Sequence, residues 1–586
     1  MTPRRKKRAI VSGSQDADVV RPAMREDNFP IAMGALTLAF VALLVCFGKH
    51  YTLLYGDAVA HLGIARRIFD SRNPGLGQLG GVWLPLPHLM MLPFVQKMEW
   101  WQDGMAGAWP SMVCYIVGVV GFYRLARWLM VERWAVAATA FYALNPNLLY
   151  LSTTAMTEPL FLALLIWCVV MTVECVAAMR AGTVRVVRRK LVLAGLLAVA
   201  AVYTRYDGWV LAAAMWCLLA WEHRRHGGTE TRRAFVLFTV LVVAAPLGWL
   251  AYNQHFFHDP LDFLRGPYSA AAIERRTTPP GGGHYRGWHD PVWAVKLFMR
   301  AAQLDVSAWE TGFGVTAAAL AGLWLVVKQR RAMAAWLLWL PLPFYVYSIA
   351  YGSVPVFIPK LWPFSYYNSR YGVEMLPALA LFAFVAAAFA EEWVRGRQPL
   401  VARVMQPVSI LLIALNTVAM MYFVPLVLKE AMVNASTRVP FERALALELK
   451  GMPPGATVLM SSSDHIGAIQ QAGIPLRQTV NEGDYFDWMD ALREPARAAA
   501  YVVAIAGDPV AEAVKLRPEG LTELDIVCST GQPCARIYRS DVYTSLHRNS
   551  LGFSATIARK PCFSQNIFHS AIWTRCCSPA GRRSGC

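Results

Sequence analysis

Charged residues are scarce in this 586-residue chain: Asp, Glu, Lys and Arg make up 16% of it, and only 38 residues are acidic against 56 that are basic. No P-loop, G-x-G-x-x-G or S-x-x-K motif stands in a credible context, so ATP use is not indicated. The 11 cysteines lack the spacing of metal ligands, which argues against a cysteine-bound metal centre. The first apolar block lacks a small-residue cleavage site, so we expect a signal anchor rather than a cleaved signal peptide.

Apolar residues are abundant instead, at 56% of the chain. They occur in blocks of about 18–22 residues, the length at which a helix crosses a bilayer, whereas a soluble chain of this size would divide among several cores. We therefore predict a mostly α-helical, polytopic membrane protein with about eleven transmembrane helices. The predicted spans are residues 30–48, 105–123, 134–152, 159–179, 190–204, 208–222, 234–252, 307–327, 333–351, 373–393 and 404–428.

The basic residues, which give a formal net charge of +18, cluster between alternate apolar blocks. Positive charge in short loops marks the cytoplasmic side of a membrane. We therefore expect a multi-pass inner (plasma) membrane protein with a cytoplasmic N terminus and an extracytoplasmic C-terminal segment. The clusters are 4–8, 124–133, 180–190, 224–233, 328–331 and 395–403.

This topology divides the chain into four parts. A basic cytoplasmic tail, 1–29, precedes a transmembrane domain, 30–430, whose outer loops are 49–104, 253–306 and 352–372. Residues 437–541 have the strand and helix patterns of a small extracytoplasmic α/β domain, in which Cys528 and Cys534 can close a small disulfide loop. Residues 543–586 contain no Asp or Glu and follow no apolar period, so we expect a disordered tail or a terminus read out of its frame.

Asp57 lies directly after the first apolar block, where a charge is costly unless it serves a function. It begins a helical pattern over 57–69 in which His61 lies one turn later. A carboxylate beside the membrane can act as a general base on an acceptor hydroxyl or amine. Because Asp is also a preferred N-cap, a purely structural role for Asp57 is equally open at this point.

Other ionisable residues fall on the same predicted outer face, and each has a functional and a structural interpretation. Arg66 can bind phosphate or extend to lipid headgroups, and His61 and His88 can contact substrate or pack at the interface. Glu158 opens a predicted span and can cap it, and Arg205 can pair with Asp207 or hold a lipid phosphate. Candidate substrate-binding residues are His61, Arg66, His88, Arg205, Asp207, Lys360, Arg370 and Tyr371.

Five segments carry a resemblance to a known family, and they appear in its order on one membrane side. They are Asp57, Leu84-Pro85-Leu86-Pro87-His88, Met156-Thr157-Glu158-Pro159, Arg205-Tyr206-Asp207, and Arg370-Tyr371 followed by Pro377. Over residues 30–430 the chain resembles the GT-C membrane glycosyltransferases. The similar branch is glycosyltransferase family 39 and its relatives, which includes the protein O-mannosyltransferases and the lipid A aminoarabinose transferases.

The resemblance implies transfer of a sugar from a polyprenyl-phosphate donor to a protein, lipid or glycan acceptor, with inversion at the anomeric carbon. It implies that Asp57 is the base or acceptor-binding carboxylate, that Glu158 or Asp70 can supply a second carboxylate, and that Arg205 and Arg370 stabilise the departing phosphate. Many relatives have two adjacent acidic residues where this chain has Asp57-Ala58. We therefore predict no metal ligands and no required cofactor, although a divalent metal remains compatible with the sequence.

Two other functional classes compete with a transferase. A transporter or flippase of lipid-linked glycans would need polar residues in the middle of its spans and repeated halves. A receptor anchored by its spans would bind through residues 437–541. The polar residues at one end of the spans favour the transferase.

Overall fold

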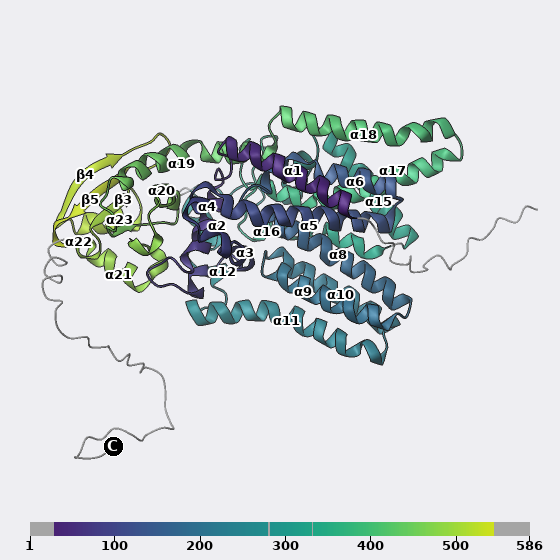
Figure 1. Cartoon of the computed structure of the whole chain (residues 1–586), viewed down its shortest axis with the longest axis horizontal. Coiled ribbons are helices and arrows are strands. Elements are labelled where there is room, and N and C mark those ends of the chain that lie inside the picture. The colour runs from purple at the N-terminus through teal and green to yellow at the C-terminus, as the bar shows by residue number, and fades with distance from the viewer. Residues whose placement is uncertain (1–27, 279–281, 331, 544–586) are drawn as a thin grey trace, which may run out of the picture.

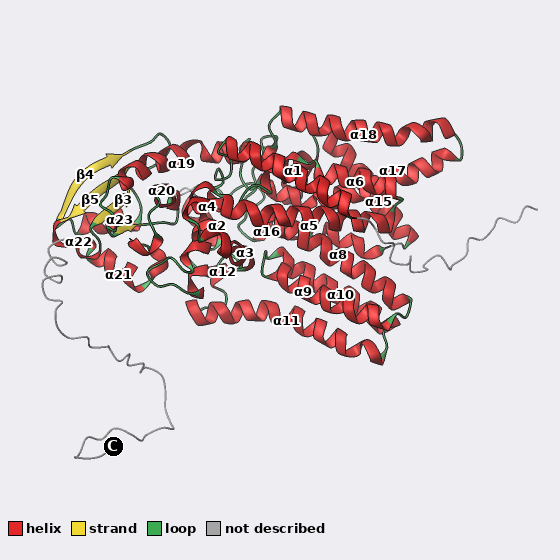
Figure 2. Cartoon of the chain, viewed as in Figure 1, coloured by secondary structure: helices red, strands yellow, loops and turns green. Residues whose placement is uncertain are grey.

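The computed structural model describes residues 28–278, 282–330 and 332–543. Residues 1–27 and 544–586 lie outside the described part, and with them almost all of the two predicted tails. Helices dominate the described chain, and a small mixed β-sheet lies at one end of the molecule (Figures 1 and 2).

Eight helical segments of the described chain are long and apolar enough to cross a membrane, so the chain is a multi-pass membrane protein. Each contains a run of strongly apolar residues with few charges, since charges are costly in lipid. Each is helical, since a helix pairs its backbone polar groups internally. They are α1 (Phe29–Gly48), α5 (Met105–Leu129), α8 (Glu158–Arg180), α11 (Thr229–Phe257), α15 (Thr311–Gln329), the 3-10 helix η2 (Met333–Trp339) with α16 (Pro341–Tyr351), η3 (Ser369–Met375) with α17 (Leu376–Arg395), and α18 (Pro399–Tyr422) with α19 (Leu426–Lys450).

All eleven predicted apolar blocks are helical, but three of them are not among these eight segments. The block 134–152 is divided into α6 (Glu132–Ala143) and α7 (Pro146–Leu151) by Asn145, whose side chain caps α7. Helix α9 (Val184–Val202) has four basic residues among its first seven. Helix α10 (Asp207–His226) ends in a charged turn, which shortens its apolar run.

The segment predicted as the first outer loop, residues 49–104, contains α2 (Gly56–Arg67), η1 (Leu76–Leu79), α3 (Leu86–Val95) and α4 (Met98–Asp103). The predicted helix over 57–69 is therefore present, ending two residues earlier than expected. The second outer loop forms α12 (Asp262–Arg265), α13 (Ala270–Thr277) and α14 (Pro291–Val306) on either side of the undescribed residues 279–281.

A five-stranded sheet of order β2-β1-β3-β5-β4 forms the core of the C-terminal α/β region. Strands β1, β2 and β3 are parallel, whereas β5 pairs antiparallel with both β3 and β4. Cys528 and Cys534 form the predicted disulfide in the β4–β5 connection. The elements are β1 (Val458–Met460), α20 (Ile466–Ala472), η4 (Leu476–Gln478), β2 (Thr479–Val480), η5 (Glu482–Asp484), α21 (Phe486–Arg493), α22 (Pro495–Ala498), β3 (Tyr501–Ile505), α23 (Pro509–Leu516), β4 (Leu521–Val527) and β5 (Ala535–Ser540).

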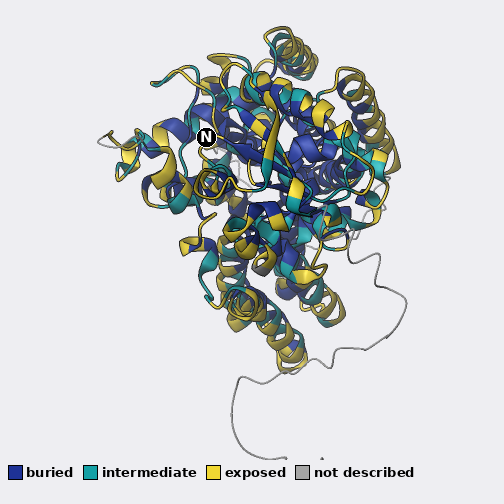
Figure 3. Ribbon diagram, turned by 90° about the vertical axis from the view of Figure 1, so that its left-hand side faces the viewer, coloured by how far each residue is buried: buried dark blue, intermediate teal, exposed yellow. Residues whose placement is uncertain are grey.

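Viewed from the α/β end, buried residues fill the centre of the molecule and exposed residues cover the outlying helices (Figure 3). Helices α15 and α17 pack closely, because Gly322 leaves room for the backbone of α17. A Cβ on Gly322 would overlap the carbonyl oxygen of Phe382. Small residues commonly permit such close approach between membrane helices.

Gly322→Ala should therefore force α15 away from α17 and reduce the free energy of unfolding by about 1–3 kcal/mol. Gly314 lies on the same helix with nothing within 4 Å of its Cβ position. Gly314→Ala should be neutral or stabilise the helix by up to about 1 kcal/mol. Thermal unfolding in detergent measures both variants, and equal losses in the two would contradict this packing argument.

Candidate active site

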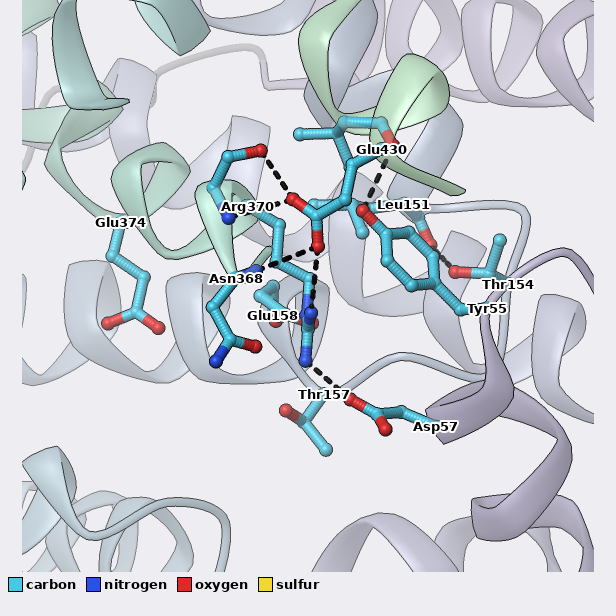
Figure 4. A network of polar contacts seen from close by, with 12 residues as sticks. Tyr55, Asp57, Leu151, Thr154, Thr157, Glu158, Asn368, Arg370, Glu374 and Glu430 are labelled. Carbon is cyan, nitrogen blue, oxygen red and sulfur yellow. Dashed lines mark hydrogen bonds and ion pairs between the residues drawn. The ribbon is translucent and has the colours of Figure 1, made fainter. Parts of the chain in front are cut away.

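Arg370, at the start of η3, is hydrogen-bonded to three carboxylates that come from distant parts of the chain (Figure 4). Its Nη2 donates to Asp57 Oδ2 at 2.5 Å, its Nε to Glu158 Oε1 at 3.2 Å and its Nη1 to Glu430 Oε1 at 3.2 Å. The arginine side chain is 7% exposed and those of Glu158 and Glu430 are fully buried. Arg370 therefore joins α2, α8 and α19.

Glu430 is also held by hydrogen bonds from the backbone at the start of η3. The backbone N–H groups of Asn368 and Ser369 donate to its two carboxylate oxygens at 3.0 and 2.7 Å, and the Ser369 hydroxyl also donates to it. Backbone donors and a guanidinium together satisfy a buried carboxylate that would otherwise be costly. Glu430 thus determines the position of the segment that carries Arg370.

Arg205, between α9 and α10, forms the second half of the site. Its Nη1 donates to Thr157 Oγ1 at 2.7 Å and its Nη2 to Tyr345 Oη at 2.6 Å. The Tyr345 hydroxyl in turn donates to Glu374 Oε1 at 2.8 Å. Arg205 lies within 3.6 Å of the carboxylates of Glu158, Asp207 and Glu374, at 3.6, 3.6 and 3.2 Å.

Tyr371 lies between the two guanidinium groups. The guanidinium carbons of Arg205 and Arg370 are 5.2 and 4.9 Å from its ring centroid, within the range of a cation–π interaction. The Tyr345 ring stacks on the Tyr371 ring with centroids 4.9 Å apart. We call this set the charged cluster: Asp57, Glu158, Arg205, Asp207, Tyr345, Arg370, Tyr371, Glu374 and Glu430.

The charged cluster contains five carboxyl groups around two guanidinium groups. Asp57 is its most exposed acid, with 43% of its side chain accessible, while Glu158, Glu374 and Glu430 are fully buried. Asp57 is therefore the carboxylate that an incoming molecule can reach directly. In the described part of the chain, Glu158 Oε2 has no hydrogen-bond partner.

Neither of the two predicted catalytic acids is the N-cap residue of its helix. The N-cap of α2 is Tyr55, and Asp57 lies in the first turn with its carboxylate on Arg370. The N-cap of α8 is Thr157, which makes no side-chain capping bond, and Glu158 points to Arg370. Both acids lie in the first turn of a helix, where a negative charge is favoured.

His61 and His88 form a buried pair beside the charged cluster. His61 Nδ1 lies 2.8 Å from His88 Nε2, and the indole of Trp83 packs 4.3 Å from the His61 ring. One ring must donate and the other accept, so the pair does not carry two positive charges. Burial lowers the pKa of His61 to about 3, with added repulsion from Arg370 and Arg205, and burial also lowers the pKa of His88.

The His61 pKa predicts loss of stability in acid. A folded pKa below the unfolded value of 6.5 means that unfolding takes up a proton as the pH falls below about 6.5. Lowering the pH from 7 to 5 should reduce the free energy of unfolding by about 2 kcal/mol through His61 alone. His61→Gln should reduce the acid-dependent loss of stability by that amount, measured by unfolding at each pH, whereas the exposed His255→Gln should leave the loss unchanged. A wild-type stability that does not change between these pH values would contradict the prediction.

The structure does not bring Arg66 and Lys360 into the charged cluster. Arg66 is buried in the first outer loop, where Nε bonds to Asp70 at 2.8 Å and Nη1 to the Val95 carbonyl at 2.7 Å. The Asp70 carboxylate balances the charge of Arg66. Asp70, the predicted alternative second carboxylate, is therefore already paired, with Arg66 and with Arg477. Lys360 is half exposed, and its nearest carboxylate is Glu310 at 4.0 Å.

Helix α19 connects the charged cluster to the α/β region. The Tyr55 hydroxyl donates to the Val427 carbonyl at 2.9 Å, and Arg438 Nη2 donates to the carbonyls of Leu53 and Leu54 at 3.0 Å each. Both contacts hold the segment that leads into Asp57. Arg438 is in turn paired with Glu442 at 2.5 Å, one turn further along α19. The helix that presents Glu430 to Arg370 therefore also positions Asp57.

Arg438→Ala should loosen the start of α2 because it removes two charged hydrogen bonds to backbone carbonyls. Amide hydrogen exchange over residues 55–61 should accelerate on the order of tenfold. Arg477→Ala is the matched control, since it breaks a 3.0 Å ion pair from the α/β region to Asp70 without touching the Asp57 segment. The same acceleration in both variants would show that Arg438 has no specific effect on this segment.

Sequence reasoning missed three members of the charged cluster. Glu374, Glu430 and Tyr345 lie within or beside predicted apolar blocks. For the two glutamates a usable signal was present, because an acid inside or next to a membrane helix marks a functional or structural partner. For Tyr345 we see no comparable signal. Among the described residues, no group of three or more His, Cys, Asp or Glu side chains has the arrangement of a metal site.

Comparison with known proteins shows a partial family match and a similar fold. Residues 101–249 match the family described as dolichyl-phosphate-mannose-protein mannosyltransferase. The fold is similar to that of ArnT from Cupriavidus metallidurans bound to undecaprenyl phosphate, with a TM-score of 0.53 at 14% identity, over 87% of this chain and 97% of that chain. The apo state of the same protein gives a TM-score of 0.50 at 15% identity, over 86% of this chain and 98% of that one.

Archaeal oligosaccharyltransferase AglB from Archaeoglobus fulgidus, in complex with an inhibitory peptide and a dolichol-phosphate, is also similar. It gives a TM-score of 0.45 at 11% identity, over 80% of this chain and 69% of that chain. No match is found among curated proteins. The resemblance to the GT-C group that the sequence motifs carry is confirmed. The chain is a multi-pass membrane protein in which residues 101–249 match this mannosyltransferase family, and its fold is similar to that of ArnT.

Proposed function

We propose that this protein transfers a sugar from a polyprenyl-phosphate-linked donor to an acceptor at the extracytoplasmic face of the membrane. The observation that carries the proposal is the pair of arginines, Arg205 and Arg370, set among carboxylates beside the accessible Asp57. A base and two cations close together are what sugar transfer from a phosphate requires, because a proton and a negative charge must both be taken up.

Asp57 is the proposed base. As the acceptor oxygen forms its bond to the anomeric carbon, its proton passes to the Asp57 carboxylate. The bond from that carbon to the phosphate oxygen breaks, and the lipid phosphate leaves with the electron pair. Arg370 Nη2, 2.5 Å from Asp57 Oδ2, holds this carboxylate in position beside the acceptor. Attack opposite the leaving group inverts the anomeric centre.

The two arginines are the proposed ligands of the phosphate. Arg205 is 16% exposed against 7% for Arg370, so Arg205 is the more accessible to a lipid headgroup. Tyr345 and Thr157 orient Arg205 through hydrogen bonds of 2.6 and 2.7 Å. Preoriented donors of this kind stabilise developing charge without reorganising during the reaction. Glu158, between the two guanidiniums, is the second acidic group of the reaction.

Acceptor contacts complete the proposal. Asp207 lies beside Arg205. His61 lies one turn after Asp57 on α2, and its partner His88 lies on α3. A neutral histidine can donate or accept a hydrogen bond from a sugar hydroxyl. The acceptor class remains open among protein, lipid and glycan, and the chemistry proposed here has no step that needs a metal.

The proposed orientation has eleven spans, a cytoplasmic N terminus and an extracytoplasmic α/β domain in the inner (plasma) membrane. In support of it, the basic segments 180–190 and 224–233 lie at the end of the bundle opposite the α/β region (Figure 1). Helix α1 runs from that end towards Asp57 and the α/β region. Positive residues accumulate on the cytoplasmic side.

Asp57→Asn should lower transfer of a labelled sugar from a polyprenyl-phosphate donor by about 10²–10⁴-fold, because the amide cannot accept the proton. The neutral side chain leaves Arg370 with Glu158 and Glu430, so the protein should still accumulate in the membrane. Asp490→Asn, at an exposed position of α21, is the control and should retain full transfer. Wild-type rates in Asp57→Asn would remove Asp57 as the base.

Transport of the lipid-linked glycan is the alternative function. Wild-type vesicles that move labelled lipid across the bilayer without sugar transfer would favour it over the transferase. The charged cluster supports transfer instead, because its ionisable groups gather at one end of the helices that carry them.

A further inference from the structure

An open groove lies between α9 and α11, at the end of the helical bundle away from the charged cluster. It has a volume of about 810 Å³ and is lined by Val184, Arg185, Arg188, Arg189, Val192, Leu193 and Glu230. Arg205 lies beyond the other end of α9, sixteen residues after Arg189, a helical distance of roughly 24 Å. This groove is therefore separate from the arginines assigned to the donor phosphate.

The groove has a strong positive charge with few partners. Arg188 and Arg189 lie three and four residues after Arg185, so both are neighbours of Arg185 on one face of α9. In the described part of the chain, none of the three forms an ion pair with a carboxylate, and only Arg188 has a hydrogen bond, from Nε to the Glu230 backbone carbonyl at 2.8 Å. Glu230 is the single acid of the lining. Most of the guanidinium donors are free to bind an anion.

One turn beyond the arginines the lining becomes apolar. Val192 and Leu193 continue the groove along α9, in the direction of the membrane interior. The candidate span α8 ends at Arg180 and the candidate span α11 begins at Thr229, so we place the membrane boundary near this level. A cationic mouth followed by an apolar wall matches a molecule with an anionic head and a hydrocarbon chain.

We propose that this groove binds an anionic glycerophospholipid of the inner leaflet. Its phosphate lies on Arg185, Arg188 and Arg189, and its acyl chain lies along Val192 and Leu193. The guanidinium fork suits phosphate oxygens, and the adjacent Val192 and Leu193 favour a ligand that also carries a hydrocarbon chain. At this end the hydrogen bond from Arg188 Nε to the Glu230 carbonyl joins α9 to α11, and a bound lipid would add further contacts between the two helices.

The test uses the full-length protein purified in detergent and titrated with phosphatidylglycerol or phosphatidylcholine. Binding is read by native mass spectrometry and by the shift in thermal unfolding temperature. The variant carries Arg185→Gln, Arg188→Gln and Arg189→Gln. A matched control carries Arg224→Gln, Arg232→Gln and Arg233→Gln, which removes the same charge at the same end of the bundle outside the groove.

We expect one phosphatidylglycerol to be retained preferentially by the wild-type protein and by the control, with affinity reduced on the order of a hundredfold in the groove variant. Equal retention of phosphatidylcholine, or equal losses in both variants, would overturn the proposal. Glycerol phosphate that displaces phosphatidylglycerol at equal concentration would also overturn it, because the apolar wall would then contribute nothing. Sugar transfer should persist in the groove variant, so failure of this test is distinguishable from failure of the proposed function.

Discussion

The Arg370 guanidinium is the constraint on which the outer end of this protein depends. A buried cation is stable only when its partners are in place, and removing one partner of such a group costs about 3–5 kcal/mol. Arg370 has three partners, Asp57, Glu158 and Glu430, carried by α2, α8 and α19. The first outer loop, the start of a central helix and the helix that leads into the α/β region must therefore meet at one point.

The α/β region influences the charged cluster through helix α19, although no residue of its sheet is a member of that cluster. Helix α19 presents Glu430 to Arg370 at one end and packs with α20 of the α/β region at the other. On the same helix, the Val427 carbonyl accepts a hydrogen bond from the Tyr55 hydroxyl, and Arg438 donates to the backbone carbonyls of Leu53 and Leu54, just before Asp57. An acceptor that moved the α/β region would act on Asp57 and Arg370 together, because one rigid helix touches the segments of both.

Sequence reasoning succeeded where one local pattern determines the structure. Hydropathy located the helices, since an apolar run of membrane length has few alternatives. It failed where a distant contact decides. Arg66 was predicted as a phosphate ligand, but its Nη1 donates to the carbonyl of Val95, 29 residues later in α3, and its other partner, Asp70, also binds Arg477 of the α/β region. Glu430 contacts Arg370 only in the folded protein, 60 residues apart in the sequence, and no local pattern around Glu430 predicts this contact.

The central claim is that Arg205 and Arg370 receive the donor phosphate beside Asp57. The most direct measurement is an electron cryomicroscopy structure of the protein in a lipid nanodisc with a polyprenyl phosphate. We expect phosphate density within about 3 Å of a guanidinium nitrogen of Arg205 or Arg370, with the Asp57 carboxylate facing the same space. A phosphate bound elsewhere, with both arginines still occupied only by their carboxylates, would contradict the account.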